Sequence, residues 1–292
     1  MKTIAYLLIA NFFIISVVNA QTTPWVQEGN GSTDPSIDFV GTTDDVDLRF
    51  RTDNTQRMCL TGTNGFLGLG TNSPAMLLHF SNGGLLSTGT TGTNPNLGAG
   101  TRFMWIPDRG AVRFGTAFDD EWDHPNVGLR SVAGGYLVLA SGESSIGLGS
   151  QIEITGNTAF GLGGELNVSG LASGAVGKTI TVTGNASYAV GCAIENDADF
   201  NITIGQGLSF ATRLTNSIEH SLMVGFNSDS PTLFVGGGDG TVGSSGNVGI
   251  GNITAPTHRL DVNGTARLRV MPNDTANVLL QAYSKMLSVT MN

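Results

Sequence analysis

Two ten-residue stretches in the middle of the chain decide the fold. They read Val168-Ser-Gly-Leu-Ala-Ser-Gly-Ala-Val-Gly177 and Val182-Thr-Gly-Asn-Ala-Ser-Tyr-Ala-Val-Gly191, and they share seven of ten residues at an offset of 14. Around them an aliphatic or aromatic residue followed by glycine returns six times, at Gly147, Gly161, Gly177, Gly191, Gly205 and Gly225, with spacings of 14, 16, 14, 14 and 20 residues. A period this short predicts stacked coils, each of which contacts only its neighbours.

Apolar residues at period two predict the inward faces of short strands. These pairs are Ile152/Ile154, Leu166/Val168, Ile180/Val182 and Leu208/Phe210. The segments Thr155-Gly-Asn157, Ser169-Gly170 and Thr183-Gly-Asn185 predict corners in which glycine and asparagine supply the positive φ.

A coil of 14 residues, at roughly 3.3 Å per extended residue, has a short perimeter. Its two strands must therefore face each other across an interior that is expected to be about one side chain thick. That thickness accounts for the small residues Ala159, Ala175, Ala189 and Thr203 beside the repeated step. So thin a roll buries little apolar surface alone, and we therefore expect it to self-associate. The 16- and 20-residue intervals are predicted to bulge outward.

The alternation V-x-G-x-x-S-x-A-V-G over residues 144–226 resembles the head repeats of YadA-like trimeric autotransporter adhesins. That resemblance implies a left-handed parallel β-roll of about five to six coils, three copies of which pack side by side in a homotrimer. A different β-solenoid or an irregular glycine-rich β-sandwich stays open as an alternative.

Two further segments flank the repeats and copy each other. Gly65-Phe-Leu-Gly-Leu-Gly70 is followed by Pro74 and Leu78-His-Phe80, and Gly246-Asn-Val-Gly-Ile-Gly251 by Pro256 and Leu260-Asp-Val262. A dinucleotide-binding loop would need a helix where the prolines stand. The pair instead resembles the "GNVGIGT…P…LDV" module of Bacteroidota-type secreted surface proteins and phage tail-fibre-like proteins, which implies short β modules at 21–97 and 227–292.

The segment 98–143 is predicted to cap the roll, because an uncovered last coil would expose its core and its strand edge. The segment resembles the stretch that precedes the head repeats in that secreted family. Trp105 and Trp122 are expected to plug the open end of the interior.

Composition narrows the function classes. The chain has 292 residues, 42 of them glycine, 13% charged residues and a net charge of −9. Few Lys and Glu with many Gly, Thr, Ser and Asn favour an all-β fold. Excess acid without a basic cluster argues against nucleic acid as a partner. Cys59 and Cys192 lie far apart in sequence and are predicted to be two isolated thiols.

Residues 1–20 carry Lys2, an apolar run from Ile4 to Val18, and Val18-Asn-Ala20 with small residues at the cleavage positions. This pattern predicts a secretory signal peptide and therefore a secreted or cell-surface protein, since a membrane anchor would need about 20 apolar residues. Relatives of the resembled family usually continue into a coiled coil, sorting domain or membrane barrel, and the chain is expected to be truncated at its C-terminal module.

Candidate chemistry is sparse. The cluster Asp119, Asp120, Glu121 and Asp123 beside His124 offers oxygen ligands for calcium but matches no EF-hand spacing, and Glu195, Asp197 and Asp199 form a second such cluster. No catalytic residue and no cofactor is predicted, because the titratable residues of the repeats fall at different points of the period.

The expected function is a non-enzymatic structural or adhesive fibre protein that binds through a trimeric β-roll surface. Its expected partners are other copies of itself and host or matrix glycans or proteins, with no small-molecule substrate. A phage tail-fibre-like receptor-binding protein and a β-solenoid carbohydrate-active enzyme are the alternatives.

Overall fold

The computed structural model describes residues 29–267, which form two separate units divided between Ser87 and Thr88. The signal peptide predicted at residues 1–20 and the end of the C-terminal module lie outside the described residues. The first unit is one sheet of four short strands: β1 (Leu48–Thr52), β2 (Thr55–Leu60), β3 (Leu67–Leu69) and β4 (Leu78–Phe80).

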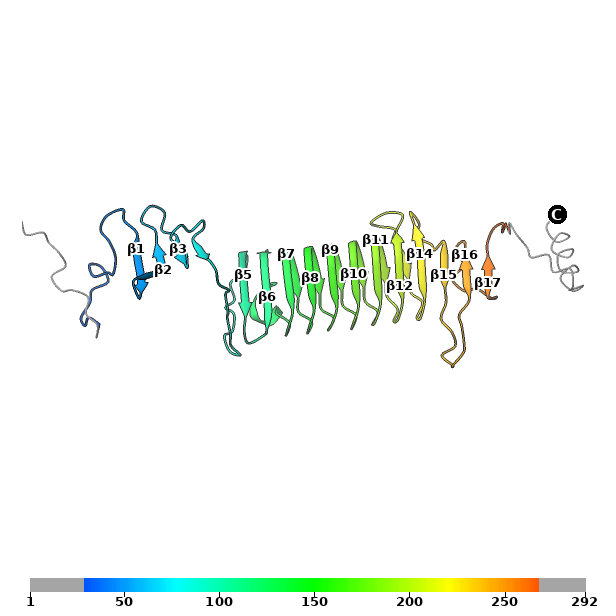
Figure 1. Ribbon diagram of the computed structural model, residues 1–292. Coiled ribbons are helices and arrows are strands. Elements are labelled where there is room, and N and C mark those ends of the chain that lie inside the picture. The colour runs from blue at the N-terminus through cyan, green and yellow to red at the C-terminus, as the bar shows by residue number, and fades with distance from the viewer. Residues whose placement is uncertain (1–28, 268–292) are drawn as a thin grey trace, which may run out of the picture. The chain divides into compact units, whose positions relative to one another are not determined.

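The second unit is a single long stack of strands (Figure 1). It starts with β5 (Gly100–Ile106) and β6 (Ala111–Ala117), which pair antiparallel. The parallel stack follows: β7 (Val132–Ala140), β8 (Ile146–Ile154), β9 (Phe160–Val168), β10 (Gly174–Val182), β11 (Tyr188–Asn196), β12 (Ile202–Gln206), β13 (Leu214–Asn216) and β14 (Leu222–Phe226). It ends with β15 (Leu233–Val235), β16 (Val248–Ile250) and β17 (Leu260–Val262). The prediction of an all-β chain with a parallel β-solenoid between short β modules is confirmed.

Each coil is one bent strand plus one turn, as β8 illustrates. A first arm, Ile146–Ser150, and a second arm, Ile152–Ile154, meet at a kink at Gln151, whose φ is 55°. The turn that follows ends at Thr158, whose φ is also 55°. Left-handed residues therefore recur every seven positions, and the chain reverses direction twice in 14 residues.

These left-handed positions correct the expected corners. The positive φ belongs to Thr158, Ala172 and Ala186, whereas Gly156, Gly170 and Gly184 are not in that region. The glycines of the turns are needed for another reason: a Cβ on Gly156 would lie 2.1 Å from the carbonyl oxygen of Gly170 in the next coil. Close stacking of successive coils, not backbone conformation, selects glycine there.

The register also corrects the alignment of the repeats. The residues in line with Gly177, Gly191, Gly205 and Gly225 are Gly149 and Gly163, not Gly147 and Gly161. The interval before Gly177 is therefore 14 residues, and the predicted bulge there does not exist. Each of the five glycines from Gly149 to Gly205 in this column has φ between 135° and 145° and lies so close to the next coil that a Cβ would meet its backbone.

The 20-residue interval is real and consists of an insertion between β12 and β13, residues 207–213. It places Leu208 and Phe210, expected in the interior, on the surface, where they are 54% and 57% exposed. Their inward positions are taken by Leu214 and Asn216, which pair with Ile194 and Asn196 of β11.

The interior has the predicted thickness. Large side chains of the second arm, such as Ile152 and Ile154, pack over small residues of the first arm, and a Cβ on Gly147 would lie 2.8 Å from the Val138 side chain. The other predicted pairs on β9 and β10 are buried too, as are Ala159, Ala175, Ala189 and Thr203.

The start of the stack is closed by Trp122 and Arg113. The Trp122 indole is buried and donates to the Val138 carbonyl at 2.9 Å, as predicted for a plug. Trp105 is not a plug: it lies on the outward face of β5 and is 40% exposed, because Met104 and Ile106 take the inward positions.

Arg113 takes the place expected for Trp105. Its guanidinium is fully buried and donates to the carbonyls of Val112, Ser131 and Ala140 and to the Ser131 hydroxyl. No carboxylate contacts it among the described residues, and burial lowers its pKa to about 10. At neutral pH the group stays protonated and closes the interior through hydrogen bonds to neutral oxygens.

The two copied segments fold alike. In each, a three-residue strand pairs parallel with the strand after the proline: β3 with β4, and β16 with β17. Gly70 and Gly251 both have φ near 80°. A Cβ on either glycine would clash with a backbone oxygen of a later residue, Ser81 or Asn263. One copy belongs to the first unit, and the other continues the sheet of the stack.

Candidate functional site

The outward face of the first arms carries two columns of apolar side chains from β5 to β17. We call this surface the apolar face. The first column contains Trp105, Val112, Val132, Ile146, Phe160, Tyr188, Ile202, Leu222, Val235, Val248 and Leu260, and the second Phe103, Phe114, Leu148, Leu162, Val176, Val190, Ile204, Val224, Leu233, Ile250 and Val262. Both columns cross parallel and antiparallel pairings without a change of register.

No other segment of residues 29–267 covers these side chains. Phe103 is 70% exposed, Val190 46% and Ile146 41%. Parallel sheets are normally covered on both faces, and a continuous exposed apolar strip marks a contact surface. The apolar face therefore has the character of one half of an interface.

The two gaps in the columns are filled by neighbouring phenylalanines. Gly134 and Gly174 stand where an apolar residue is expected, and a Cβ there would lie 2.2 Å and 2.3 Å from the rings of Phe114 and Phe160. Each ring lies over the glycine of the next strand, so the strip stays continuous and apolar.

The first unit carries the same double column on its own sheet. Leu48, Leu60, Leu67 and Leu78 form one row, and Phe50, Met58, Leu69 and Phe80 form the other. Leu60 and Leu78 are 40% and 51% exposed. The two units thus present the same kind of surface.

Reasoning from the sequence missed the apolar face, although a signal for it exists. In segments such as Ile202-Thr-Ile-Gly205 the large residues alternate with Gly, Ala or Thr. The small residue points inward and the large ones outward, which inverts the usual arrangement. A step of one large residue beside glycine does not by itself show that the large residue faces outward.

In the acidic loop predicted as a candidate calcium site, two carboxylates accept hydrogen bonds from backbone amides. Glu121 accepts hydrogen bonds from the amides of Phe118 and Asp119, and Asp123 accepts from those of Leu97 and Gly98. The carbonyl of Asp120 accepts from Asn126. The carboxylates shape the connection between β6 and β7 that carries Trp122.

The second acidic cluster is dispersed. Asp199 accepts hydrogen bonds from the backbone and side chain of Asn185 in the turn below it, while Glu195 lies on β11 opposite Thr215 of β13. Across residues 29–267, no three His, Cys, Asp or Glu side chains are arranged to hold a metal ion. Cys59 and Cys192 are both free, as predicted.

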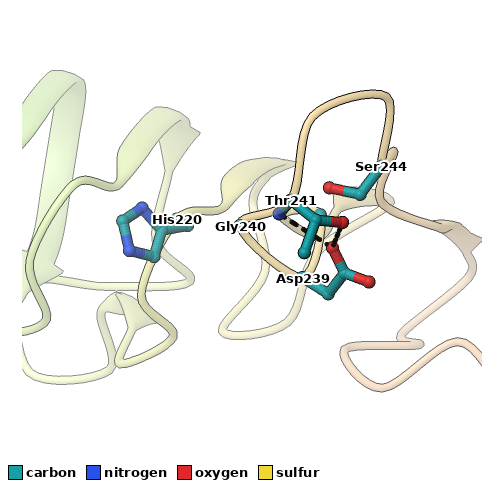
Figure 2. Close-up of a pocket in the computed structure, with 6 residues that line it drawn as sticks. His220, Asp239, Gly240, Thr241 and Ser244 are labelled. Carbon is teal, nitrogen blue, oxygen red and sulfur yellow. Dashed lines mark hydrogen bonds between the residues drawn. The ribbon is translucent and has the colours of Figure 1, made fainter.

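The glycine-rich loop between β15 and β16 forms a pocket with His220 (Figure 2). Asp239 accepts from the Thr241 hydroxyl at 2.6 Å and the Thr241 amide at 3.0 Å, and the hydroxyl bond in particular lowers the pKa of Asp239. The His220 ring stacks on Phe200 with centroids 4.9 Å apart. Figure 2 shows the Asp239 carboxylate turned toward Thr241, with His220 across the pocket, so no acid-base pair is formed.

No protein-family model, characterised protein or solved structure is significantly similar to this chain. Within the described part, the structure contains no helix with the length and apolarity to cross a membrane.

Proposed function

We propose that this protein is a secreted or cell-surface structural fibre subunit, non-enzymatic and adhesive, which assembles side by side into a homotrimer. The observation that carries the proposal is the apolar face: two columns from β5 to β17, with their two glycine gaps filled by phenylalanine rings, that nothing in residues 29–267 covers. Three copies related by a three-fold axis would turn these columns toward one another and remove them from water. The three-fold state follows the resemblance of the repeats to YadA-like heads.

The surface suits identical copies better than an unrelated partner. Because each column repeats at the spacing of the coils, neighbouring copies in register would match along their full length. The first unit bears the same double column, so it can join the same assembly. Adhesion would then take place on the outer surfaces of the fibre, with host or matrix glycans or proteins as partners.

Sedimentation of residues 21–292 tests the proposal. We expect a mass three times that of one chain. Val190→Glu places a charge in the centre of the apolar face and should release monomers. Burying an unpaired carboxylate in the assembly would cost about 3 kcal/mol or more. Thr215→Glu is the matched control on the second-arm side and should stay trimeric. A wild-type protein that sediments as a monomer would overturn the proposal.

A further inference from the structure

The outer surface of the second arms carries a groove of a different kind. It is about 490 Å³ in volume and crosses β7, β8, β9 and β10. We call it the polar groove; its polar lining includes Gln151, Glu153, Glu165, Asn167, Thr181 and Arg213 over apolar floor residues such as Ile152 and Leu166. A volume of this size accommodates a ligand of several rings.

The polar groups of the groove are already held in fixed positions. Asn167 donates to Glu153 at 3.2 Å, Thr179 donates to Glu165 at 2.6 Å, and Arg213 donates to Thr181 at 2.7 Å. Each bond except that of Arg213 joins one coil to the next. The carboxylates and the amide keep free lone pairs and donors for a ligand, in a geometry that the stacked backbone sets.

Two insertions bound the groove. Arg213 arrives from the insertion after β12, and Glu121 from the connection before β7. Both segments depart from the 14-residue period, which is otherwise kept from β7 to β12. The connection before β7 and the insertion after β12 thus each add one side chain, Glu121 and Arg213, to a lining that otherwise comes from the regular coils.

Exposed aromatic rings stand at both ends. Tyr136, next to the lining residue Leu137, is 45% exposed and contacts Phe118 edge to face at 6.5 Å. At the other end Phe210 lies under the Lys178 ammonium, 5.3 Å away, and Lys178 pairs with Glu165 at 3.4 Å. Ser150 and Gly164 stand between Tyr136 and Lys178 in the same row across the strands. Because their side chains are small, the rim of the groove does not protrude between the two aromatic rings.

Aromatic faces beside carboxylate, amide and guanidinium groups match the chemistry of a sugar chain. The CH faces of sugar rings pack on aromatic rings, and vicinal hydroxyls both donate to carboxylates and accept from amides and guanidinium groups. Successive coils repeat about every 4.8 Å, and an extended glycan advances by a similar distance per sugar. The lining holds three carboxylates, Glu121, Glu153 and Glu165, against one guanidinium, which disfavours acidic sugars.

We infer that the polar groove binds a linear neutral glycan laid along the axis of the coils, with sugar rings on Tyr136 and Phe210 and hydroxyls on Glu153, Asn167 and Arg213. The inference rests on the proposed adhesive function, because it assigns the ligand class and the site of that adhesion. The lining of the groove lies at the kinks and on the second arms, and Tyr136 stands at the end of the first arm of β7, outside the two columns of the apolar face. Assembly through those columns therefore leaves the groove open.

The test uses residues 21–292 and neutral hexasaccharides of β-1,4-linked glucose, xylose, mannose and N-acetylglucosamine, with hexagalacturonate as the acidic comparison. Saturation-transfer NMR and titration calorimetry measure binding. At least one neutral hexasaccharide should bind, and hexagalacturonate should bind at least about tenfold more weakly. Glu153→Gln and Phe210→Ala should each weaken the neutral ligand about tenfold or more.

Phe200→Ala is the matched control, since Phe200 is a similarly exposed ring, 55% against 57%, that stacks on His220 outside the groove. Its binding should be unchanged. No binding by the whole panel, preference for hexagalacturonate, or equal losses in Phe200→Ala and Phe210→Ala would overturn the inference. Sedimentation of the same samples separates the two ideas: a trimer that binds no glycan defeats only the groove, and a glycan-binding monomer defeats only the assembly.

Discussion

The outer surfaces of the two arms of a coil differ in chemistry, one mainly apolar and the other mainly polar. On β10 the first arm presents Val176 outward, and the second arm presents Thr181. Four neighbouring coils put Leu139, Glu153, Asn167 and Thr181 in line on the second arm, while the first arm repeats large apolar residues. One backbone period thus carries two independent side-chain patterns.

The difference shows how a thin solenoid divides its tasks. The interior uses small residues on the first arm and large ones on the second, so the first arm has its large residues free for the outside. A chain that cannot bury enough surface alone can bury the rest against copies of itself. The second arm keeps its polar residues for solvent and ligands.

The strongest way to break both surfaces at once is Gly163→Ala. A Cβ there would lie 1.9 Å from the Gly177 carbonyl oxygen, and φ is 137°, so the coils cannot stack without moving apart. We expect a loss of more than about 4 kcal/mol in the free energy of unfolding, measured by urea titration. Gly164→Ala is the control, because its Cβ would meet only the Ser150 oxygen at 3.6 Å. Equal stability of the two variants would contradict the stacking argument.

A triple change tests whether the polar side limits association. Glu153→Val, Asn167→Val and Thr181→Val turn the second arms of β8, β9 and β10 into a second apolar column. We expect assemblies larger than those of the wild type, since a new exposed apolar strip promotes association. Light scattering at matched concentrations measures this. The polar triple variant Glu153→Gln, Asn167→Gln and Thr181→Ser should keep the wild-type mass, and unchanged scattering in the valine variant would refute the idea.

Arg113→Ala tests the closure from which both surfaces start. The change removes a fully buried side chain and one donor from each of the carbonyls of Val112, Ser131 and Ala140. The Ser131 and Ala140 carbonyls keep a backbone donor, the amides of Val112 and Gly128. We expect a loss of about 3 kcal/mol in the free energy of unfolding, read from thermal or urea unfolding. Arg130→Ala removes an exposed arginine nearby and should cost less than about 1 kcal/mol. A similar loss in both variants would show that the buried guanidinium is dispensable.

The smallest expected effect is on the titration of Glu165. The hydrogen bond from Thr179, and then the Lys178 charge, hold the pKa of Glu165 below its ordinary value of 4.5. Because a depressed pKa favours the ionised form in the folded state, its contribution is present above pH 4.5 and disappears as the pH falls through the lower folded value. Thr179→Ala should raise the pKa toward 4.5, followed by carboxyl ¹³C NMR.

Alanine is a suitable replacement there, since Ala193 occupies the same left-handed position in the next coil with φ of 54°. A Glu165 titration that is identical in the wild type and in Thr179→Ala would show that the hydroxyl bond does not set the pKa.

The amino-acid sequence by itself determined the period, the class of fold and the copied modules. A 14-residue repeat admits only coils of this length, and inward pairs such as Ile152/Ile154 are fixed by strand alternation. The equivalence of Gly70 and Gly251 can also be predicted from the sequence, because both end a matching six-residue glycine string and are followed by a proline four or five residues later.

Only the tertiary structure decided which glycines align and which large residues face outward. In Ile146-Gly-Leu-Gly149 two glycines follow large residues, and only pairing with the next coil selects Gly149 as the member of the column. Likewise, Leu208/Phe210 has the spacing of an inward pair but lies in an insertion. Strand alternation predicts that neighbouring side chains point to opposite sides of a strand. It does not predict which side is the interior, because that depends on contacts with other coils, which the local sequence does not contain. The apolar face and the polar groove exist only once those contacts are made.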